Sequence, residues 1–472
     1  MAKNARLALP GVLVFLLASA VQAEIKPHAL ISDGMVLQQK ATSTVWGTAK
    51  PDEDITVVLG SVKPVTVRAD KEGKWTAQIP GQKAGGPYAL TISGKDEKDT
   101  VKLKDVYIGE VWICSGQSNM EMGLGGCENG EEARKKSQNE QIRLFTVPHH
   151  RANAPTTDIK AAWVECGPKT VGGFSGVAYF FGRDLQKALG VPVGLIHTSV
   201  GGTAAEEWTS KKVLESDPAF KSLAPGGSKL YNGMIAPLLP FAVKGAIWYQ
   251  GESNAGSFER VQQYEKLFAA LIENWRHDWN QPEMPFLFVQ LAPFMKKETE
   301  PTDTPWARMR EVQRLTSLNP KLAPIAMAVI TDSGDEKDIH PKKKEPAGVR
   351  LALAARAIAY NEKDLEYSGP QYKSMQIQDG KAVLSFSHDK GGLEAQDGKL
   401  TGFTIAGEDG NFINADATIE GDKAVVSSPK IVRPAAVRYG WANYPEGNLW
   451  NKAGLPASPF RTDDWPPVAK KK

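Results

Sequence analysis

A chain of 472 residues is too long to fold around one hydrophobic core, so its length predicts about two or three domains. With 41% hydrophobic and 24% charged residues, the composition is that of a globular protein and excludes global disorder. The net charge of +3 is nearly neutral and argues against nucleic acid or another polyanion as a partner.

The first 23 residues have the pattern of a secretory signal peptide. Lys3 and Arg6 precede an apolar run over residues 7–20, and small residues surround a cleavage point after Ala23. The run is shorter than the roughly 18 residues that span a bilayer, and no later segment reaches that length. We therefore expect removal of residues 1–23 and export to a periplasmic or extracellular location without a stable membrane anchor. An uncleaved anchor is the alternative interpretation.

Residues 24–105 consist of short β-type segments separated by turn clusters at intervals of about ten residues, which favours a small sandwich. No acid-base set occurs in this N-terminal β domain. We therefore interpret this domain as a support for the rest of the molecule or as a module that faces carbohydrate. A role in packing alone is the stronger interpretation. The expected strands are 35–38, 44–46, 55–59, 66–69, 75–78 and 88–93.

Between residues 106 and 366 the pattern changes to strands that alternate with helices. Alternation of this kind predicts an α/β domain with a parallel sheet, helices on both faces, and functional loops at the carboxyl ends of the strands. We expect strands at 106–114, 193–199, 246–249, 286–290 and 325–330, and helices at 177–189, 259–275, 308–315 and 346–360.

Residues 367–472 return to short strands with Gly and Asp turns, for example 382–386, 400–406 and 424–427, and predict a C-terminal β region. Its tail over 448–461 is rich in aromatic and turn residues. We expect this tail to fold back on the middle domain.

Four loops that follow predicted strands of the middle domain contain the residue types that acyl transfer requires. A serine hydroxyl is a poor nucleophile at neutral pH, so it needs an imidazole within hydrogen-bond reach and an acid that orients the imidazole. Ser118, His340 and Asp338 can fill these three roles. The four loops are Gly116-Gln117-Ser118-Asn119, Gly201-Gly202-Thr203, Gln250-Gly251-Glu252-Ser253-Asn254 and Asp338-Ile339-His340-Pro341.

Attack on an ester places negative charge on the carbonyl oxygen, which needs preorganised donors in a dry pocket. The backbone N–H groups of Ser118 and Gly202 suit this role, because glycine allows close backbone approach. The side-chain amide of Gln250 or Asn254 would be a third donor. Ordinary turns and loop caps are the alternative explanation for these residues.

Few other histidines compete for the role of base, since the chain has seven. His197 lies inside an apolar strand and reads as a hydrogen-bonded core residue. His28 and His388 fall in the flanking β regions, and surface residence is their default interpretation.

Together the four loops resemble the SGNH hydrolases, and within them the sialate O-acetylesterase and acetyl-xylan esterase branch. The resemblance rests on the phrases around Gly116-Gln117-Ser118-Asn119, Trp248-Tyr249-Gln250-Gly251-Glu252 and Asp338-Ile339-His340-Pro341, in this order along the chain. It implies a flavodoxin-like esterase core between N- and C-terminal β-sandwich-like regions. It also implies an O-acetylated carbohydrate as substrate, cleaved through an acetyl-enzyme intermediate.

By this resemblance Ser118 is the nucleophile, His340 the general base and then acid, and Ser118, Gly202 and Gln250 the oxyanion donors. The superfamily's acid usually lies three residues before the histidine, where this chain has Lys337. Asp338 is therefore the expected acid, with Glu252 as the alternative. The superfamily's third-block asparagine also has no unambiguous match, because Gln250, Ser253 and Asn254 all lie near it.

The resemblance leaves the acetylated sugar open. A sialate 9-O-acetylesterase is the favoured interpretation, and an esterase for acetylated xylan or another polysaccharide is the alternative. A carbohydrate-binding protein with an inactive esterase core is a rival from another class.

No metal or other cofactor is expected, because the histidines are scattered and the mechanism requires none. Three cysteines permit at most one internal disulfide: Cys127 with Cys166 is the better pair, and Cys114 reads as a buried thiol. Glu121 could brace the serine turn, and Arg308 and Arg310 could reach an acidic sugar. Trp208, Trp248 and Trp306 either pack in the core or stack against sugar rings, and the sequence favours neither interpretation. The sequence leaves the oligomeric state open.

Overall fold

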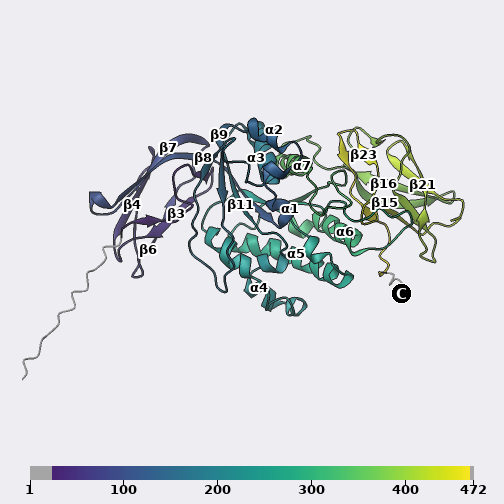
Figure 1. Ribbon diagram of the computed structural model, residues 1–472, viewed down its shortest axis with the longest axis horizontal. Coiled ribbons are helices and arrows are strands. Elements are labelled where there is room, and N and C mark those ends of the chain that lie inside the picture. Colours follow the sequence, from purple (N-terminus) through teal and green to yellow (C-terminus); the bar gives the residue numbers. More distant parts are fainter. Residues whose placement is uncertain (1–23, 468–472) are drawn as a thin grey trace, which may run out of the picture.

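The computed structural model describes residues 24–467, which form an N-terminal β region, a middle α/β domain and a C-terminal β region arranged in a row (Figure 1). The predicted signal peptide lies outside the described residues. Within 24–467, no helix combines the length and the apolar character needed to cross a membrane.

Most strands of the N-terminal region are antiparallel and lie in two sheets, whereas β2 pairs in parallel with the long strand that follows β7. One sheet has the order β1-β3-β6, and in the other β4 pairs with β5 and β7. In β6, Trp75, Ala77 and Ile79 point into the core while the residues between them are exposed, so the alternation expected of a half-buried strand is present. The strands are β1 Lys26–Pro27, β2 Val36–Gln38, β3 Ser43–Thr48, β4 Asp54–Leu59, β5 Val65–Arg68, β6 Lys74–Ile79 and β7 Gly85–Ser93.

One long strand, β8 (Thr100–Gly116), joins this region to the middle domain. Its first half pairs antiparallel with β7, from Thr100 opposite Ser93 to Ile108 opposite Gly85. Its second half pairs in parallel with strands on both sides in the middle domain. The strand continues through residues 105 and 106, although Asp105 has a φ of +55° and the pairing with β7 shifts register there, so a single bulged strand belongs to the sheets of both regions.

The middle domain confirms the predicted α/β class. Its sheet has the order β10-β9-β11-β8-β12-β13-β14, and all neighbours from β9 to β14 are parallel. The five strands β11-β8-β12-β13-β14 follow the flavodoxin-like order, with a reversal of strand order beside β8. Strand β9 and the edge strand β10 are absent from the sequence prediction. The strands are β9 Asn139–Thr146, β10 Val164–Cys166, β11 Val193–Ser199, β12 Gly245–Tyr249, β13 Phe286–Val289 and β14 Ile325–Ala328.

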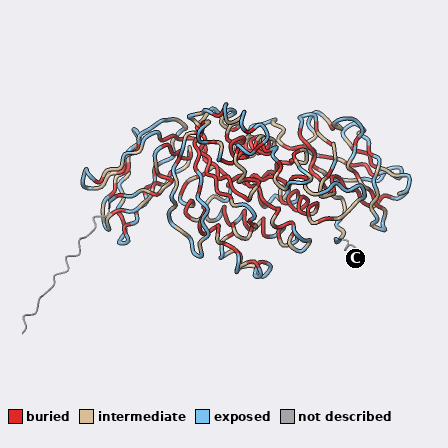
Figure 2. The backbone as a smooth tube through the Cα atoms, in the orientation of Figure 1, coloured by how far each residue is buried: buried red, intermediate tan, exposed pale blue. Residues whose placement is uncertain are grey.

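Helices cover both faces of this sheet, because alternate side chains of its strands are apolar on both sides. Trp112 and Tyr249 pack with helices α3 and α7, whereas Ile113 and Trp248 pack with α5 and α6. The strands of the sheet form the buried centre of the molecule (Figure 2). The helices are α1 Ser118–Glu121, α2 Gly130–Lys135, α3 Gly176–Leu189, α4 Lys211–Ser216, α5 Phe258–Asp278, α6 Pro305–Ser317 and α7 Glu345–Ile358.

The C-terminal region contains two four-stranded antiparallel sheets, β15-β16-β21-β20 and β19-β18-β22-β25, around a shared apolar core, with a small third sheet β17-β23-β24. The predicted β-sandwich-like region is therefore present. The strands are β15 Gln371–Gln378, β16 Lys381–Ser387, β17 Leu393–Ala395, β18 Phe403–Ala406, β19 Ile413–Asn414, β20 Asp416–Glu420, β21 Lys423–Ser427, β22 Ala436–Tyr439, β23 Leu449–Asn451, β24 Leu455–Pro456 and β25 Phe460–Arg461.

The C-terminal region is fixed to the middle domain by arginines of α6. Arg310 is fully buried and donates to the carbonyl oxygens of Leu291, Ala292, Ala442 and Asn443 at 2.7–3.1 Å. The tail folds back as predicted, since Ser458 Oγ accepts a hydrogen bond from Gln290 Nε2 at 2.9 Å. Arg310 is thus occupied by backbone carbonyls and has no role in sugar binding.

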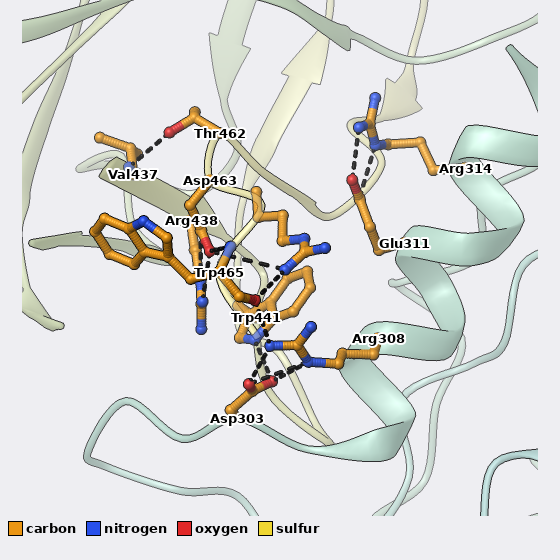
Figure 3. Close-up of polar contacts among 11 residues, drawn as sticks. Asp303, Arg308, Glu311, Arg314, Val437, Arg438, Trp441, Thr462, Asp463 and Trp465 are labelled. Carbon is orange, nitrogen blue, oxygen red and sulfur yellow. Dashed lines mark hydrogen bonds and ion pairs between the residues drawn. The ribbon is translucent and has the colours of Figure 1, made fainter. Parts of the chain in front are cut away.

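Arg308 is also held by protein groups. Its guanidinium forms an ion pair with Asp303 at 2.5 Å and donates to the Trp465 carbonyl at 3.1 Å (Figure 3). The three tryptophans Trp208, Trp248 and Trp306 are all buried, which assigns them to core packing.

The three cysteines are free thiols, so the considered pair Cys127 and Cys166 is not bridged. Each thiol is buried and donates instead to a nearby carbonyl: Cys127 Sγ to Gly123 at 3.5 Å and Cys166 Sγ to Ser137 at 3.4 Å. Burial raises the pKa of both thiols, to about 11 and about 12 respectively.

His197 is a core residue, as predicted, whereas the surface placement of His28 is wrong. His197 Nε2 lies 2.6 Å from Ser199 Oγ, and burial lowers its pKa to about 4. His28 is 3% exposed and stacks on Trp46, because the N-terminal sheet packs over it. Burial also lowers the pKa of His28 to about 4.

Because His197 is buried in its neutral form, the protein will lose stability in mild acid. Between pH 6.5 and pH 4 the unfolded chain binds a proton at this position and the folded chain does not. The contribution of neutral His197 is complete above pH 6.5, and it falls by up to about 3 kcal/mol as the pH approaches 4.

Urea unfolding at pH 7 and pH 4.5 measures this loss. His197→Gln should lose less free energy of unfolding between the two pH values than the wild type does. His277→Gln, at an exposed position, is the matched control and should keep the wild-type difference. Equal pH dependence in all three proteins would contradict the prediction.

Candidate active site

Ser118 lies where β8 ends and turns sharply into the short helix α1. Gly116 has a φ of +141°, and a Cβ at this position would lie 2.1 Å from the Tyr249 carbonyl oxygen of the adjacent strand. Gln117 follows with its N–H bonded to the same carbonyl at 3.0 Å. The turn therefore depends on glycine, and it places Ser118 at the carboxyl end of the sheet beside the reversal of strand order.

His340 reaches Ser118 from the loop between β14 and α7. Its Nε2 lies 2.8 Å from Ser118 Oγ, although the two residues are 222 positions apart in the chain. The His340 side chain is 37% exposed, so the imidazole lies at the rim of the sheet, open to a ligand from solvent. This distance is that of a hydrogen bond between a hydroxyl group and an imidazole.

Asp338 is close to His340 but holds it loosely. Asp338 Oδ1 accepts the backbone N–H of His340 at 2.8 Å and lies 3.5 Å from Nδ1 of the ring. The second distance exceeds that of a normal N–H···O bond, and the carboxylate is 52% exposed. The structure thus brings Ser118, His340 and Asp338 together in the predicted sequence of contacts.

Glu252, the alternative acid, is placed behind Asn119 instead. Its Oε1 accepts a hydrogen bond from Asn119 Nδ2 at 2.6 Å, and no hydrogen bond or ion pair joins Glu252 to His340 among the described residues. Asn119 Nδ2 also donates to the carbonyl of Ile339 at 3.0 Å. Asn119 therefore connects the serine turn, the Glu252 loop and the residue that precedes His340.

Lys344 completes this buried network. Its Nζ donates to Asn119 Oδ1, so all polar atoms of the Asn119 side chain have partners. Burial lowers the pKa of Lys344 to about 8, against the opposing effect of Glu252, and burial raises the pKa of Glu252. The three side chains form one unit that holds the loop containing His340 against α1.

The turn after β11 lies directly against Ser118. A Cβ on Gly201 would lie 3.3 Å from Ser118 Cβ, and Gly202 has a φ of +71°. Glu121 braces this turn: its Oε2 accepts the Gly201 N–H at 2.6 Å, and its Oε1 lies 2.9 Å from His149 Nε2. Within residues 24–467, the N–H groups of Ser118 and Gly202 have no acceptor and remain available to a ligand.

The prediction that Gln250 donates to an oxyanion needs correction. Its amide nitrogen donates to the Thr203 carbonyl at 3.2 Å and to Asn254 Oδ1 at 2.7 Å, which uses both amide hydrogens. Asn254 is buried, accepts the Ala205 N–H and donates to Glu206. These two amides brace the segment that follows Gly202, and neither is presented to Ser118.

Comparison with known proteins identifies a family and individual proteins that are similar to this chain. Residues 108–356 match the family model described as carbohydrate esterase, sialic acid-specific acetylesterase. The human sialate O-acetylesterase is 30% identical over 479 residues, which cover 91% of each chain, and the mouse enzyme is 28% identical over 91% of this chain and 93% of its own.

The chain belongs to this carbohydrate esterase family. The crystal structure of a carbohydrate acetylesterase from Xanthomonas citri is similar over 93% of this chain and 100% of its own, with 40% identity and a TM-score of 0.86. The family resemblance stated from the sequence motifs and the predicted fold class are therefore confirmed.

For two residues of this esterase site, Asn119 and Lys344, no role was predicted from the sequence. Asn119 belongs to the Gly-Gln-Ser-Asn motif, but the motif does not predict which groups its side chain hydrogen-bonds. Lys344 stands in the run Lys342-Lys343-Lys344, which looks like a solvated charge cluster, yet its side chain is buried. Its position four residues after His340 is the only sequence signal that could have suggested a link to the site. The described residues contain no cluster of metal-ligating side chains.

Gly116→Ala should damage both the stability and the activity of the esterase. The added Cβ meets the Tyr249 carbonyl, and alanine is strained at this φ, so we expect a loss of at least about 2 kcal/mol in the free energy of unfolding. Gly173→Ala is the matched control, because a Cβ there meets no atom within 4 Å. Denaturant unfolding of the two variants tests this, and a Gly116→Ala protein as stable as the control would contradict it.

Proposed function

We propose that this carbohydrate esterase hydrolyses acetyl esters on sugars through an acetyl-enzyme formed on Ser118, and that its substrate is an O-acetylated sialic acid. The observation that carries the proposal is the 2.8 Å contact between Ser118 Oγ and His340 Nε2. It also argues against an inactive core in a carbohydrate-binding protein, because nucleophile and base are already within hydrogen-bond reach.

In the first step Ser118 Oγ attacks the acetyl carbonyl while His340 Nε2 takes the hydroxyl proton. The free N–H groups of Ser118 and Gly202 are the two proposed donors to the resulting oxyanion. Collapse of the tetrahedral intermediate breaks the bond to the sugar oxygen, and His340 returns its proton to that oxygen. The sugar leaves as an alcohol, and the acetyl group stays on Ser118.

In the second step a water molecule attacks the acetyl-enzyme, and His340 removes one of its protons. The oxyanion forms again at the same donors, and the proton on His340 then passes to Ser118 Oγ as acetate leaves. Asp338 is the proposed acid that orients and stabilises the charged imidazole. We assign Glu252, Asn119 and Lys344 to positioning, since Asn119 holds the carbonyl next to His340.

Release of acetate from two substrates tests which acetylated sugar the enzyme prefers. O-acetylated sialic acid and acetylated xylan are offered to the full-length enzyme at equal ester concentration, and we expect kcat/KM at least tenfold higher for the sialic acid. A preference for acetylated xylan would move the assignment to the polysaccharide alternative. The support for sialic acid is the family match and the sialate O-acetylesterases that resemble the chain.

Export is part of the proposal and rests on the N-terminal sequence pattern. Expression of the full chain in a bacterial host should yield a periplasmic or secreted protein that begins at Glu24. Intact mass measurement of the exported protein checks this, and a protein that retains residues 1–23 would contradict cleavage after Ala23.

A further inference from the structure

A cavity of about 290 Å³ lies between the C-terminal region and the loop that precedes α6, away from Ser118 and His340. It is at the small end of the range for ligand pockets in proteins. Its wall combines aromatic rings, hydroxyl groups and one arginine. The residues that matter are Thr302, Asp303, Thr404, Phe412, Arg438 and Trp441.

Arg438 has the geometry of a prepared ligand-binding group. Its guanidinium lies 4.0 Å from the Phe412 ring centre and 4.9 Å from that of Trp441, and 6% of the side chain is exposed. Nε and Nη2 donate to the two oxygens of Asp463 at 2.9 and 2.8 Å. Nη1 has no acceptor within residues 24–467, so its N–H groups are left for a ligand in the cavity that Arg438 lines.

The cluster around Arg438 also carries an unbalanced positive charge. Arg308, Arg438 and Arg461 form ion pairs with two carboxylates, Asp303 and Asp463. Figure 3 shows the pairs of Arg308 with Asp303 and of Arg438 with Asp463. The nearby pair Glu311 and Arg314 neutralises itself at 2.7 Å. Burial lowers the pKa of Arg461, and the charges of Arg308 and Arg438 lower it further. Each arginine contacts a carboxylate, but three positive charges face two negative ones, so these five side chains have a net charge of +1. This excess favours an anion at the free edge of Arg438.

The rest of the wall suits a sugar better than a bare ion. Phe412 and Trp441 give the wall apolar ring surface beside Arg438, and the Thr404 hydroxyl has no hydrogen-bond partner in the described chain. Asp303 is already occupied by Arg308 and by Trp441 Nε1 at 3.2 Å, so it adds little free negative charge to repel an anion. We propose that this cavity binds a sugar residue that carries a carboxylate, as a second carbohydrate site separate from the site of ester cleavage.

Isothermal titration of the full-length enzyme with glucuronate, N-acetylneuraminate and glucose tests the proposal. We expect at least one of the two acidic sugars to bind at least tenfold more tightly than glucose, and the tighter of them identifies the source of the carboxylate. Ser118→Ala should bind it equally well, because the cavity does not include Ser118. Absence of binding by both acidic sugars, or equal binding of glucose, would overturn the proposal.

Arg438→Lys keeps a cation beside Asp463 but removes the planar group and its free N–H edge. We expect at least tenfold weaker binding, with unchanged turnover of an aryl acetate. Arg461→Lys, in the same cluster but outside the cavity wall, is the matched control and should retain wild-type binding. If Arg438→Lys does not fold, Thr404→Val tests the same cavity. Its affinity for the acidic sugar should then be at least threefold lower than that of the wild type. Binding that survives in the folded variants, or that free acetate displaces as readily as the sugar does, would refute the carboxylated-sugar site.

Discussion

Replacing Ser118 with alanine should lower kcat/KM for an aryl acetate by about 10⁴- to 10⁶-fold. The variant keeps His340 and both backbone donors but has no atom that can form the acyl bond. The fold should be unaffected, since Ser118 is only partly buried and its hydroxyl contacts His340 alone among the described groups. Turnover of 4-nitrophenyl acetate and the thermal midpoint are the two measurements.

Ser115→Ala is the matched control for this experiment. Ser115 lies three residues earlier on β8, and its hydroxyl is buried without a hydrogen-bond partner in the described structure. The same chemical change there should leave both turnover and the thermal midpoint close to those of the wild type. Wild-type activity in Ser118→Ala, or equal losses in the two variants, would exclude Ser118 as nucleophile.

We expect the second large effect on activity when Asp338, the proposed acid next to His340, is replaced. Asp338→Asn should lower kcat by about 10²- to 10⁴-fold, because the imidazolium that forms in each step loses its neighbouring negative charge. Measurement of kcat and KM for 4-nitrophenyl acetate separates the loss in rate from any change in substrate binding.

Glu252→Gln is the comparison that separates the two carboxylates. The glutamine oxygen can still accept the hydrogen bond from Asn119 that Glu252 accepts at 2.6 Å. We therefore expect a loss of less than about tenfold in kcat. Glu252→Ala removes the acceptor and should cost more than the glutamine variant. A larger loss of kcat in Glu252→Gln than in Asp338→Asn would transfer the role of acid to Glu252.

Sequence periodicity was sufficient for most of the fold. The strand at Val193–Ser199 was predicted to the residue, because a continuous apolar run is typical of a parallel strand buried on both faces. Strand β9, which lies between β10 and β11, was missed because its first residues, Asn139-Glu140-Gln141, are polar and precede the apolar half. Side-chain patterns identify strands that are buried along their whole length better than strands that begin with polar residues.

The site was only partly predictable, because residue types do not reveal hydrogen-bond assignments. Ser118 and His340 could be named from their motifs, and the geometry brings them together. Gln250 was an equally reasonable donor by type, but its two amide hydrogens are used inside the protein. The burial of Lys344 depends on contacts with Asn119, whose loop is distant in sequence, and no local pattern reports such contacts.

The shared strand β8 makes the N-terminal region inseparable from the chemistry it supports. The first residues of β8 pair with β7 and its last residues pair with β11 and β12, so the strand that ends at the turn before Ser118 begins in the N-terminal sheet. The pairing with β7 shifts register around Asp105, which has a φ of +55°, so the two regions are joined through a bulged strand. A deletion of the N-terminal region would therefore also remove the first half of the strand that carries the nucleophile.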